Sequence, residues 1–590
     1  MSQEIKICQN CKVQFTIEPE DFTFYEKIKV PPPTWCPECR MIRRMVFRNE
    51  RALYKGTCAL CRKNIITMYA PNSPFTVHCT ECYQSNKWDP LSYAQNHDFS
   101  KPFFAQFADL FRAVPRRALY FDFAVNSDYT NWGLHLKDAY LVFGGHHYEN
   151  VAYASQCIYL KDCFDTDFLW NSEQCYESLH LRKCNRVYFS LYSEECLDSW
   201  FLIGCRNCQH CFGCVNLRNK TYCIFNKQYA KEDYERALLD MDLGLYDNFK
   251  KFRDKFHEHA LRYPRKYAWM RNVVNSTGDD IENSKDCRVC FSIEDAENLH
   301  YVFYGGQDSK DGYDLDHVGV GSQLVYEALS AFALNRVAFI TRVYYSHDVS
   351  YSDDCYNSAY LFGCIGLRKK EYCILNKQYS KEEYKLIVSK IIDQMKRVTY
   401  TDGKGHAYNY GEFFPPEISP FAYNETVAQE HFPLTRERAV ELGFRWREPD
   451  TKSYKITKAF SELPQNINDV EDNILNEVIS CAHEGKCNEQ CTTAFRIIPA
   501  ELQFLRTVGI PIPRLCPNCR HYQRLKQRNP LKLWHRKCGC TGNKLENSIY
   551  QNSASHFHGT DHCPNEFETS YAPERKEIVY CEQCYNAEVV

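Results

Sequence analysis

The chain has 590 residues, of which 44% are hydrophobic and 25% are charged, and its formal net charge is −3. This length indicates roughly three to five domains, and the apolar share excludes wholesale disorder. The balanced charge excludes a uniformly basic coat for nucleic acid. Without a run of about 18 apolar residues, or a signal-peptide pattern after Met1, we expect neither a membrane span nor export.

Residues 1–90 carry two pairs of knuckles, in each of which two cysteines are separated by two residues. Zinc prefers four soft ligands in a tetrahedron, and two facing knuckles supply them. We therefore predict two zinc ribbons, one after the other. Their ligands are Cys8, Cys11, Cys36 and Cys39 in the first ribbon and Cys58, Cys61, Cys79 and Cys82 in the second.

Residues 100–245 and 248–398 are predicted to be two copies of one unit. The segment Cys214–Tyr229 recurs as Cys364–Tyr379, about 150 positions later. A duplication of this length indicates two domains of the same architecture in tandem.

A finer period runs through each copy. In the first copy, Cys163, Cys184 and Cys205 lie 21 positions apart, and short apolar triplets typical of strands precede them. A period near 20 residues without internal helices is typical of stacked coils. We therefore predict a mainly β chain with tandem units that resemble a parallel β-helix, with coils of about 21 residues, flanking helices and a pair of zinc ribbons at either end.

Helices are expected after the coils. Ser380 and Glu383 form a capping box, so a helix should begin there and run to about Arg397. Residues 400–477 match neither repeat and are rich in proline and aromatic residues, which favours an ordered connector. Within it, Thr435 is a candidate N-cap of a short helix.

Four closely spaced cysteines in the first copy match the spacing of ligands to an iron–sulfur cluster. They are Cys205, Cys208, Cys211 and Cys214. The corresponding residues of the second copy are Cys355, Ser358, Leu361 and Cys364. Replacement by small or apolar residues favours buried thiols that act as small hydrophobes, with zinc or a cluster as the alternatives.

Aspartates recur at equal spacing in both copies. They are Asp162, Asp165 and Asp167 in the first copy and Asp311, Asp314 and Asp316 in the second. Carboxylates on one strand face could supply an acid, a base or calcium ligands to an enzyme that acts on a glycan polymer. The alternative is that they cap turns at the corners of the coils, as aspartate commonly does.

Residues 478–590 repeat the N-terminal pattern and predict a second ribbon pair. The expected ligands are Cys487, Cys491, Cys516 and Cys519, followed by Cys538, Cys563, Cys581 and Cys584. About 22 extra residues lie inside the last ribbon, so Cys540 could replace Cys538. The insertion could hold a fifth metal ion, or its histidines could be solvated. Its candidate ligands are Cys540, His556, His558 and His562.

Basic residues gather around the second knuckles at both ends of the chain. They are Arg40, Arg43 and Arg44 near the N-terminus and Arg520, Arg524, Lys526, Arg528, Arg536 and Lys537 near the C-terminus. Cations interleaved with aromatic residues such as Trp534 suit contact with phosphates and stacking on bases. The alternative is an ordinary basic surface helix that binds nothing.

Three segments resemble an uncharacterised family of cysteine-rich proteins from bacteria with reduced genomes. They are Asn376–Tyr384, Gly411–Pro416 and Thr569–Pro573. The resemblance implies zinc-ribbon modules and no established activity.

The 33 cysteines are odd in number and sparser than in a disulfide scaffold, which favours thiolate–metal sites in a reducing cytoplasm. We expect about four zinc ions per chain, or five with the insertion. No nucleotide-binding or hydrolase motif is found, which makes an enzyme the less favoured class. The sequence thus predicts a cytoplasmic zinc scaffold whose ribbons contact nucleic acid or a nucleoprotein. A glycan-acting enzyme and a purely protein–protein scaffold are the alternatives.

Overall fold

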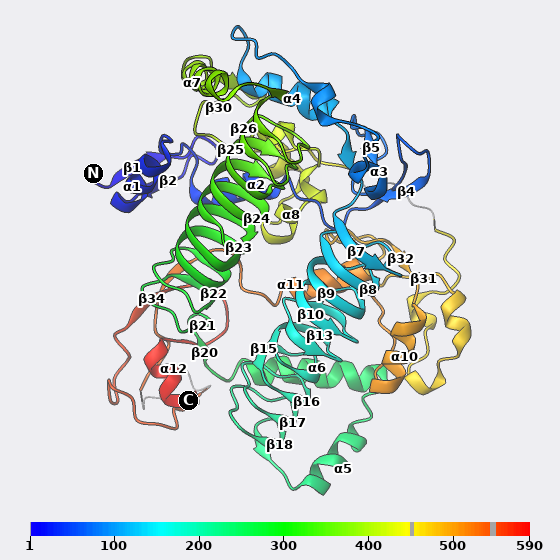
Figure 1. The fold of residues 1–590 in the computed structure, drawn as a ribbon. Coiled ribbons are helices and arrows are strands. Elements are labelled where there is room, and N and C mark those ends of the chain that lie inside the picture. Colours follow the sequence, from blue (N-terminus) through cyan, green and yellow to red (C-terminus); the bar gives the residue numbers. More distant parts are fainter. Residues whose placement is uncertain (1, 449–453, 543–549) are drawn as a thin grey trace. The chain divides into compact units, whose positions relative to one another are not determined.

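The computed structural model describes residues 2–448, 454–542 and 550–590, and it forms two compact units (Figure 1). Unit 1 comprises Met1–Leu119, Ala268–Glu448 and Leu531–Leu533, and unit 2 comprises Tyr120–Tyr267, Pro449–Pro530 and Trp534–Val590. The N-terminal cysteine knuckles therefore fold with the second repeat, and the C-terminal knuckles fold with the first. Parts of the predicted connector and of the predicted insertion lie outside the described residues.

Unit 1 begins with short hairpins and helices that surround the knuckles. These are β1 (Glu4–Ile7), β2 (Gln14–Ile17), α1 (Pro19–Ile28), α2 (Pro37–Met45), β3 (Tyr54–Thr57), β4 (Asn64–Thr67), β5 (Val77–His78), α3 (Thr80–Gln84), η1 (Pro90–Tyr93), α4 (Phe103–Ala113) and β6 (Arg116–Arg117). The second repeat and the segment after it add β21 (Met270–Arg271), β22 (Gly278–Glu282), β23 (Cys290–Gly319), β24 (Gln323–Thr341), β25 (Tyr344–Asp353), β26 (Ala359–Phe362), β27 (Glu371–Ile374), β28 (Lys377–Gln378), α7 (Lys381–Arg397), β29 (Tyr400–Thr401), β30 (Ala407–Tyr408), η2 (Pro416–Ile418), η3 (Tyr423–Glu425), α8 (Val427–His431) and α9 (Arg436–Glu441).

Unit 2 begins with the first repeat. Its elements are β7 (Phe121–Val125), β8 (Gly133–Tyr140), β9 (Phe143–Ala152), β10 (Ser155–Lys161), β11 (Phe164–Asp167), β12 (Trp170–Glu173), β13 (Tyr176–Arg182), β14 (Asn185–Tyr188), β15 (Leu191–Glu194), β16 (Leu197–Trp200), β17 (Gln209–Phe212), β18 (Thr221–Ile224), β19 (Lys227–Gln228), α5 (Lys231–Met241), α6 (Tyr246–Ala260) and β20 (Arg265–Lys266). The C-terminal part adds η4 (Phe460–Glu462), η5 (Ile467–Asp469), η6 (Asp472–Asn476), β31 (Ile479–Ser480), β32 (Ala494–Phe495), α10 (Pro499–Val508), α11 (Pro517–Leu525), β33 (Trp534–Lys537), β34 (Glu566–Thr569), β35 (Val579–Tyr580) and α12 (Glu582–Val589).

The chain is mainly β, as predicted, and each repeat forms a barrel of parallel strands. In most places the register between neighbouring strands is twelve residues. Gly145 pairs with Cys157 in unit 2, and Val337, Val349 and Leu361 pair in succession in unit 1. Figure 1 shows these turns stacked along β8–β16 and along β23–β26. The predicted repeat of 21 residues is therefore wrong as the length of one turn.

The backbone changes direction at every third residue of the repeats. Tyr159, Asp162, Asp165 and Phe168 all have a positive φ, between 53° and 56°. This left-handed conformation bends the chain sharply, and residues other than glycine rarely adopt it unless the surrounding structure holds them there. Four such bends complete one turn of twelve residues.

The three-residue spacing explains why the sequence suggested a longer period. Side chains that follow a bend, such as Leu160, Cys163 and Leu169, are buried at 0–2% exposure. Interior positions thus recur every third residue, and 21 is a multiple of three. Cysteines 21 positions apart are all interior, but they lie on different sides of the barrel.

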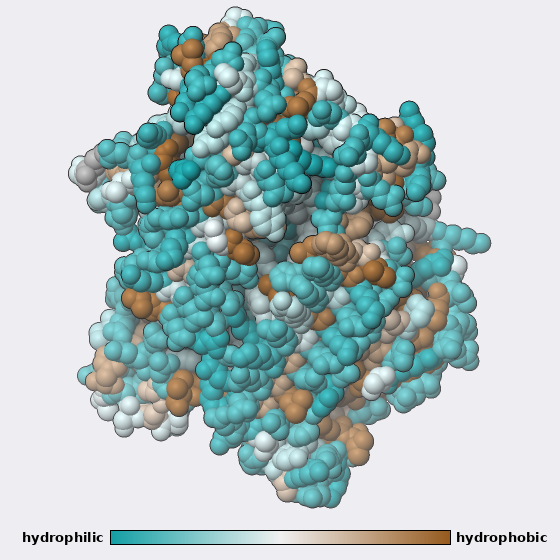
Figure 2. Space-filling model, in the orientation of Figure 1, coloured by the Kyte–Doolittle hydropathy of each residue, from teal (hydrophilic) through white to brown (hydrophobic). Residues whose placement is uncertain are grey.

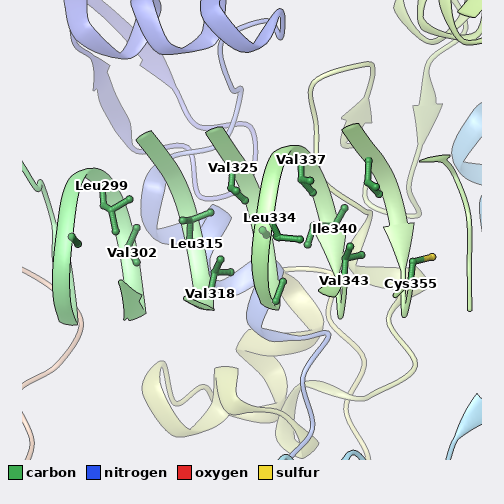
Figure 3. Packing of buried hydrophobic residues seen from close by; sticks show 14 of the residues in the cluster. Leu299, Val302, Leu315, Val318, Val325, Leu334, Val337, Ile340, Val343 and Cys355 are labelled. Atoms are coloured by element: carbon green, nitrogen blue, oxygen red, sulfur yellow. The ribbon is translucent and has the colours of Figure 1, made fainter. Parts of the chain in front are cut away.

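Aliphatic side chains and cysteines fill the interior of each repeat. Figure 3 shows those of unit 1 pointing inward from successive turns, and the labelled residues are Leu299, Val302, Leu315, Val318, Val325, Leu334, Val337, Ile340, Val343 and Cys355. In unit 2 cysteines take many of these positions. The face drawn in Figure 2 is mostly hydrophilic, with scattered hydrophobic residues, as expected when the apolar stripes are inside.

The four closely spaced cysteines of the first repeat belong to this interior. Cys205, Cys208, Cys211 and Cys214 are at most 1% exposed. Each Sγ donates a hydrogen bond to the carbonyl of the residue two positions earlier, at 3.4–3.8 Å. In this interior the four side chains pack as small hydrophobic groups.

Two predicted helix starts are confirmed in unit 1. Helix α7 begins after Ser380, whose hydroxyl accepts from the Glu383 amide while the Glu383 carboxylate accepts from the Ser380 amide, and it ends at Arg397. Thr435 accepts from the Arg438 amide at the start of α9.

Candidate metal centres

The part of the chain that the structure describes includes four groups of four cysteines that could hold a metal ion. They are Cys8, Cys11, Cys36 and Cys39; Cys58, Cys61, Cys79 and Cys82; Cys481, Cys491, Cys516 and Cys519; and Cys538, Cys563, Cys581 and Cys584. The ligand atoms of each group lie within 4.8 Å of one another. The Sγ–Sγ distances include 3.7 Å for Cys11 and Cys36 and 3.8 Å for Cys563 and Cys581. A tetrahedron with Zn–S bonds of about 2.3 Å has edges of about 3.8 Å.

The same local structure builds each group. The first knuckle lies in a turn, as between β1 and β2, and the second knuckle begins a helix. Cys36 is the N-cap of α2, and Pro37 occupies the first turn, where its missing N–H costs nothing. Cys39 follows one turn later. Both thiols therefore lie at a helix N-terminus, whose partial positive charge favours thiolates.

One hydrogen bond is common to all four groups, and it identifies the equivalent ligands in each group. The amide of the third cysteine donates to Sγ of the first, in the pairs Cys36–Cys8, Cys79–Cys58, Cys516–Cys481 and Cys581–Cys538, at 3.1–3.3 Å. By this criterion Cys538 is the first ligand of the last group. The alternative, in which Cys540 replaces Cys538, is therefore not favoured.

The third group includes a ligand that the sequence did not reveal. Cys481 takes the place that Cys8 has in the first group, and its Sγ lies 3.8 Å from that of Cys519. Cys487, the predicted ligand, is also near, with its Sγ 3.7 Å from that of Cys519. The third site thus has five neighbouring thiols.

A fifth group forms at the insertion of the last ribbon. It consists of Cys540, His556, His558 and Cys584, and its last member also belongs to the fourth cysteine group. The sequence predicted the first three of these residues. His562, the fourth predicted residue, is not a member of this group, and Cys584 takes its place.

The predicted basic face of the first ribbon is buried. Arg40, Arg43 and Arg44 project from α2, with side chains at most 1% exposed. Four carboxylates of unit 1 face them at 2.5–3.2 Å: Asp314, Asp316, Glu327 and Glu412. We call these seven residues the arginine clamp of unit 1. The prediction of phosphate contact is wrong for these three arginines, because solvent does not reach them.

The clamp of unit 2 has the same plan. Arg520 and Arg524 project from α11, again following the cysteines of a second knuckle. Arg524 donates to Asp167 at 2.6 Å and to Asp165 at 2.9 Å. Arg520 lies 2.8 Å from Asp165 and from Glu501. Both arginines are at most 3% exposed, so the prediction of phosphate contact is wrong for them too.

The four remaining predicted cations differ in their exposure. Arg528 is buried over the ring of Phe168. Arg536 is half-buried and donates to backbone carbonyls. Lys526 and Lys537 are exposed and pair with glutamates. A continuous basic surface is therefore not formed by these nine residues.

The two clamps also account for four of the six recurring aspartates, while Asp162 and Asp311 are half-buried and accept from Asn150 and Asn298. Asp165, Asp167, Asp314 and Asp316 have no exposed surface, so none of them faces a polymer in solution. The bends at Asp165 and Asp314 agree with the alternative that they are corner residues. Burial raises the pKa of Asp316 to about 7, although Arg44 beside it acts in the opposite direction. The clamp of unit 1 has one more carboxylate than guanidinium groups, in keeping with the raised pKa of Asp316.

No family model matches the chain, and no curated protein matches it, so the family resemblance stays a prediction. Among solved structures, a putative acetyltransferase from Desulfovibrio desulfuricans G20 aligns with 46% of this chain and 75% of its own, at 10% identity and a TM-score of 0.10. A score at this level carries no argument. Among the residues that the structure describes, no helix has both the length and the apolarity needed to cross a membrane.

Proposed function

We propose that this protein is a zinc-stabilised scaffold, in which two parallel β-helices with coils of twelve residues are each braced by a pair of zinc ribbons. The observation that carries the proposal is that one helix in each unit carries both the second knuckle of a metal site and the buried arginines. In unit 1 this helix is α2, and in unit 2 it is α11.

In unit 1 the metal ligands and the arginines follow one another along α2. Cys36 and Cys39 would fix its first turn to the ion, and the next residue, Arg40, donates to Asp314 at 2.9 Å. Arg43 and Arg44 follow at helical spacing and reach the remaining carboxylates. An ion at the N-terminus of α2 would therefore set the position of three buried guanidinium groups.

Buried ion pairs require such positioning. Moving a charge out of water costs several kcal/mol, which is offset only when the partners are held in good geometry. Arginine suits this role because its planar fork contacts two carboxylates at once, as Arg43 does with Glu327 and Glu412, at 2.8 and 2.7 Å. A ribbon locked by zinc would supply this geometry to each β-helix.

Elemental analysis tests the metal content. We expect at least four zinc ions per purified chain, one for each group of four cysteines. Cys39→Ser should remove one of them. Cys355→Ser, which replaces a fully buried interior cysteine of the same unit, should leave the content unchanged. Two or fewer zinc ions in the unaltered chain would contradict the proposal.

The free cysteines bear on the cellular compartment of the protein. All 33 cysteines are free in the structure, and the proposed sites need thiolates. We therefore propose a cytoplasmic, reducing environment, where thiols are kept reduced.

We propose as a second function that the protein binds nucleic acid or a nucleoprotein, at a surface other than the ribbons. The observation that favours it is an exposed aromatic column in unit 2, formed by Phe123, His135, His147 and Tyr159, which lie twelve positions apart. Successive ring centroids are 4.8, 4.7 and 4.5 Å apart. The end members are 72% and 51% exposed. Because the inner rings face one another, unpaired bases could extend the column by stacking on its two end rings, Phe123 and Tyr159.

Binding to single-stranded RNA or DNA tests this second proposal. Replacing Phe123 and Tyr159 together by alanine should weaken binding at least about tenfold, since stacking contributes about 1–3 kcal/mol per base. Tyr345→Ala, at a tyrosine of unit 1 that is 58% exposed, is the matched control and should change little. If the unaltered protein binds neither RNA nor DNA at about 50 mM salt, a protein–protein scaffold becomes the better proposal.

A further inference from the structure

The insertion in the last ribbon brings two histidines and a cysteine to a thiol that already belongs to the fourth cysteine group. Cys540 Sγ lies 3.5 Å from His556 Nδ1, and Cys584 Sγ lies 3.3 Å from His558 Nε2. Ligands around one zinc ion, with bonds of about 2.3 Å to sulfur and 2.0–2.1 Å to nitrogen, are separated by about 3.5 Å. All four ligand atoms lie within 4.8 Å of one another.

We propose that the last ribbon is a two-metal centre in which the Cys584 thiolate bridges two zinc ions. One ion would be held by Cys538, Cys563, Cys581 and Cys584. The other would be held by Cys540, His556, His558 and Cys584. Seven side chains thus give each ion four ligands, provided that one sulfur is shared. The inference rests on the proposal that the fourth ribbon binds zinc.

The histidines are oriented as metal ligands usually are. His556 directs Nε2 to Glu588 Oε1 at 2.8 Å, and His558 directs Nδ1 to the Asp561 carbonyl at 2.7 Å. Because these partners are acceptors, both ring nitrogens must carry their protons there. The opposite nitrogens then present lone pairs to sulfur, an arrangement that a metal ion between them would satisfy.

Glu588 links the insertion to α12. Its carboxylate accepts from the amides of Ser553 and Ala554 at 2.9–3.0 Å, as well as from His556. The side chains of His556 and Glu588 are at most 1% exposed. The position of His556 is therefore fixed by buried contacts.

Two asparagine side chains would stabilise the negative charge of the two-metal centre. Five thiolates and two divalent ions would leave a net charge of −1, which is costly in a buried site. Two amide side chains donate to the sulfurs, Asn552 to Cys540 at 3.2 Å and Asn565 to Cys581 at 3.3 Å. Since each ion would have four protein ligands, neither has an open position, and the pair would be structural rather than catalytic.

Zinc analysis of full-length variants tests the shared ligand. We expect five zinc ions per unaltered chain and four in His558→Ala. Cys584→Ser should lower the content by two ions, because it removes a ligand from both. Cys82→Ser is the matched control, since Cys82 has the same place in the second ribbon without an insertion, and it should lower the content by one.

Cadmium-113 NMR of the cadmium-substituted chain gives a second readout that does not depend on a folded Cys584 variant. Two resonances with mutual scalar coupling are expected, one from a site of four sulfurs and one from a site of two sulfurs and two nitrogens. His558→Ala should remove the second resonance and the coupling. Four zinc ions in the unaltered chain, with no effect of His558→Ala, would overturn the two-metal centre and leave the scaffold proposal standing. Two or fewer would overturn both.

Discussion

Arg44→Ala is expected to lower the free energy of unfolding of unit 1 by about 3–5 kcal/mol, the usual cost of breaking a buried ion pair from one side. The guanidinium of Arg44 has no exposed surface and contacts three carboxylates. These are Asp316, Glu327 and Asp314, at 2.5, 2.7 and 3.2 Å. Without Arg44 these buried charges lose a partner, and β23 and β24 should open more often. Hydrogen exchange in these two strands, followed over a urea series, measures the change.

An exposed ion pair of the same unit is the control. Arg336 contacts Asp348 at 2.7 Å, but its side chain is 56% exposed, so Arg336→Ala should cost less than about 1 kcal/mol. Arg44→Lys should recover only part of the loss, because an ammonium group cannot reproduce the fork that contacts Asp316 and Glu327. Equal effects of Arg44→Ala and Arg336→Ala would contradict a stabilising role for the clamp.

The metal sites were largely predictable because their chemistry is local. A knuckle, its turn and the helix that follows lie within a few residues, so spacing alone indicates them. Cys481 was missed for a physical reason. Counting back from Cys516 by the spacing between Cys8 and Cys36 leads to the neighbourhood of Cys487, and a longer first knuckle hides the more distant cysteine.

The clamps could not be predicted in the same way, because their partners are far apart in the chain. Arg40 and Asp314 are separated by 274 positions, and only the folded barrel brings them together. The sequence does contain two features that point to the clamps, one in the repeats and one in the ribbons. The aspartates recur in both repeats, and an arginine follows the second knuckle at both ends of the chain. Two duplicated motifs of opposite charge are candidates for mutual contact. Considered without the aspartates, the arginines instead suggest a basic surface.

The predicted length of one turn, 21 residues, was wrong because the cysteine pattern is ambiguous. A repeat of 21 residues and a turn of twelve share the factor of three that sets interior positions, so the cysteine pattern alone could not distinguish them. Exposed ladders carry the missing information. Arg186 contacts Asp198, and Arg336 contacts Asp348, each across twelve positions.

Removing zinc with a chelator is expected to loosen β23 and β24, although neither strand contains a metal ligand of the first ribbon. Structural zinc contributes about 10–16 kcal/mol of apparent binding free energy in zinc-finger peptides, so its loss should unfold the ribbons. Once α2 is no longer fixed at Cys36 and Cys39, its arginines leave Asp314 and Glu327, and buried carboxylates remain unpaired.

Hydrogen exchange measured before and after chelation should therefore show lost protection in the ribbons and around Asp314, while the interior of unit 2 at β16 exchanges as before. Readdition of zinc should restore protection in both places. Acidification should act like the chelator, because acid protonates the cysteines and only their thiolate form holds the ion. Protection that persists around Asp314 after zinc has gone would mean that the clamp holds α2 by itself. The metal would then be a consequence of the fold rather than a support for it.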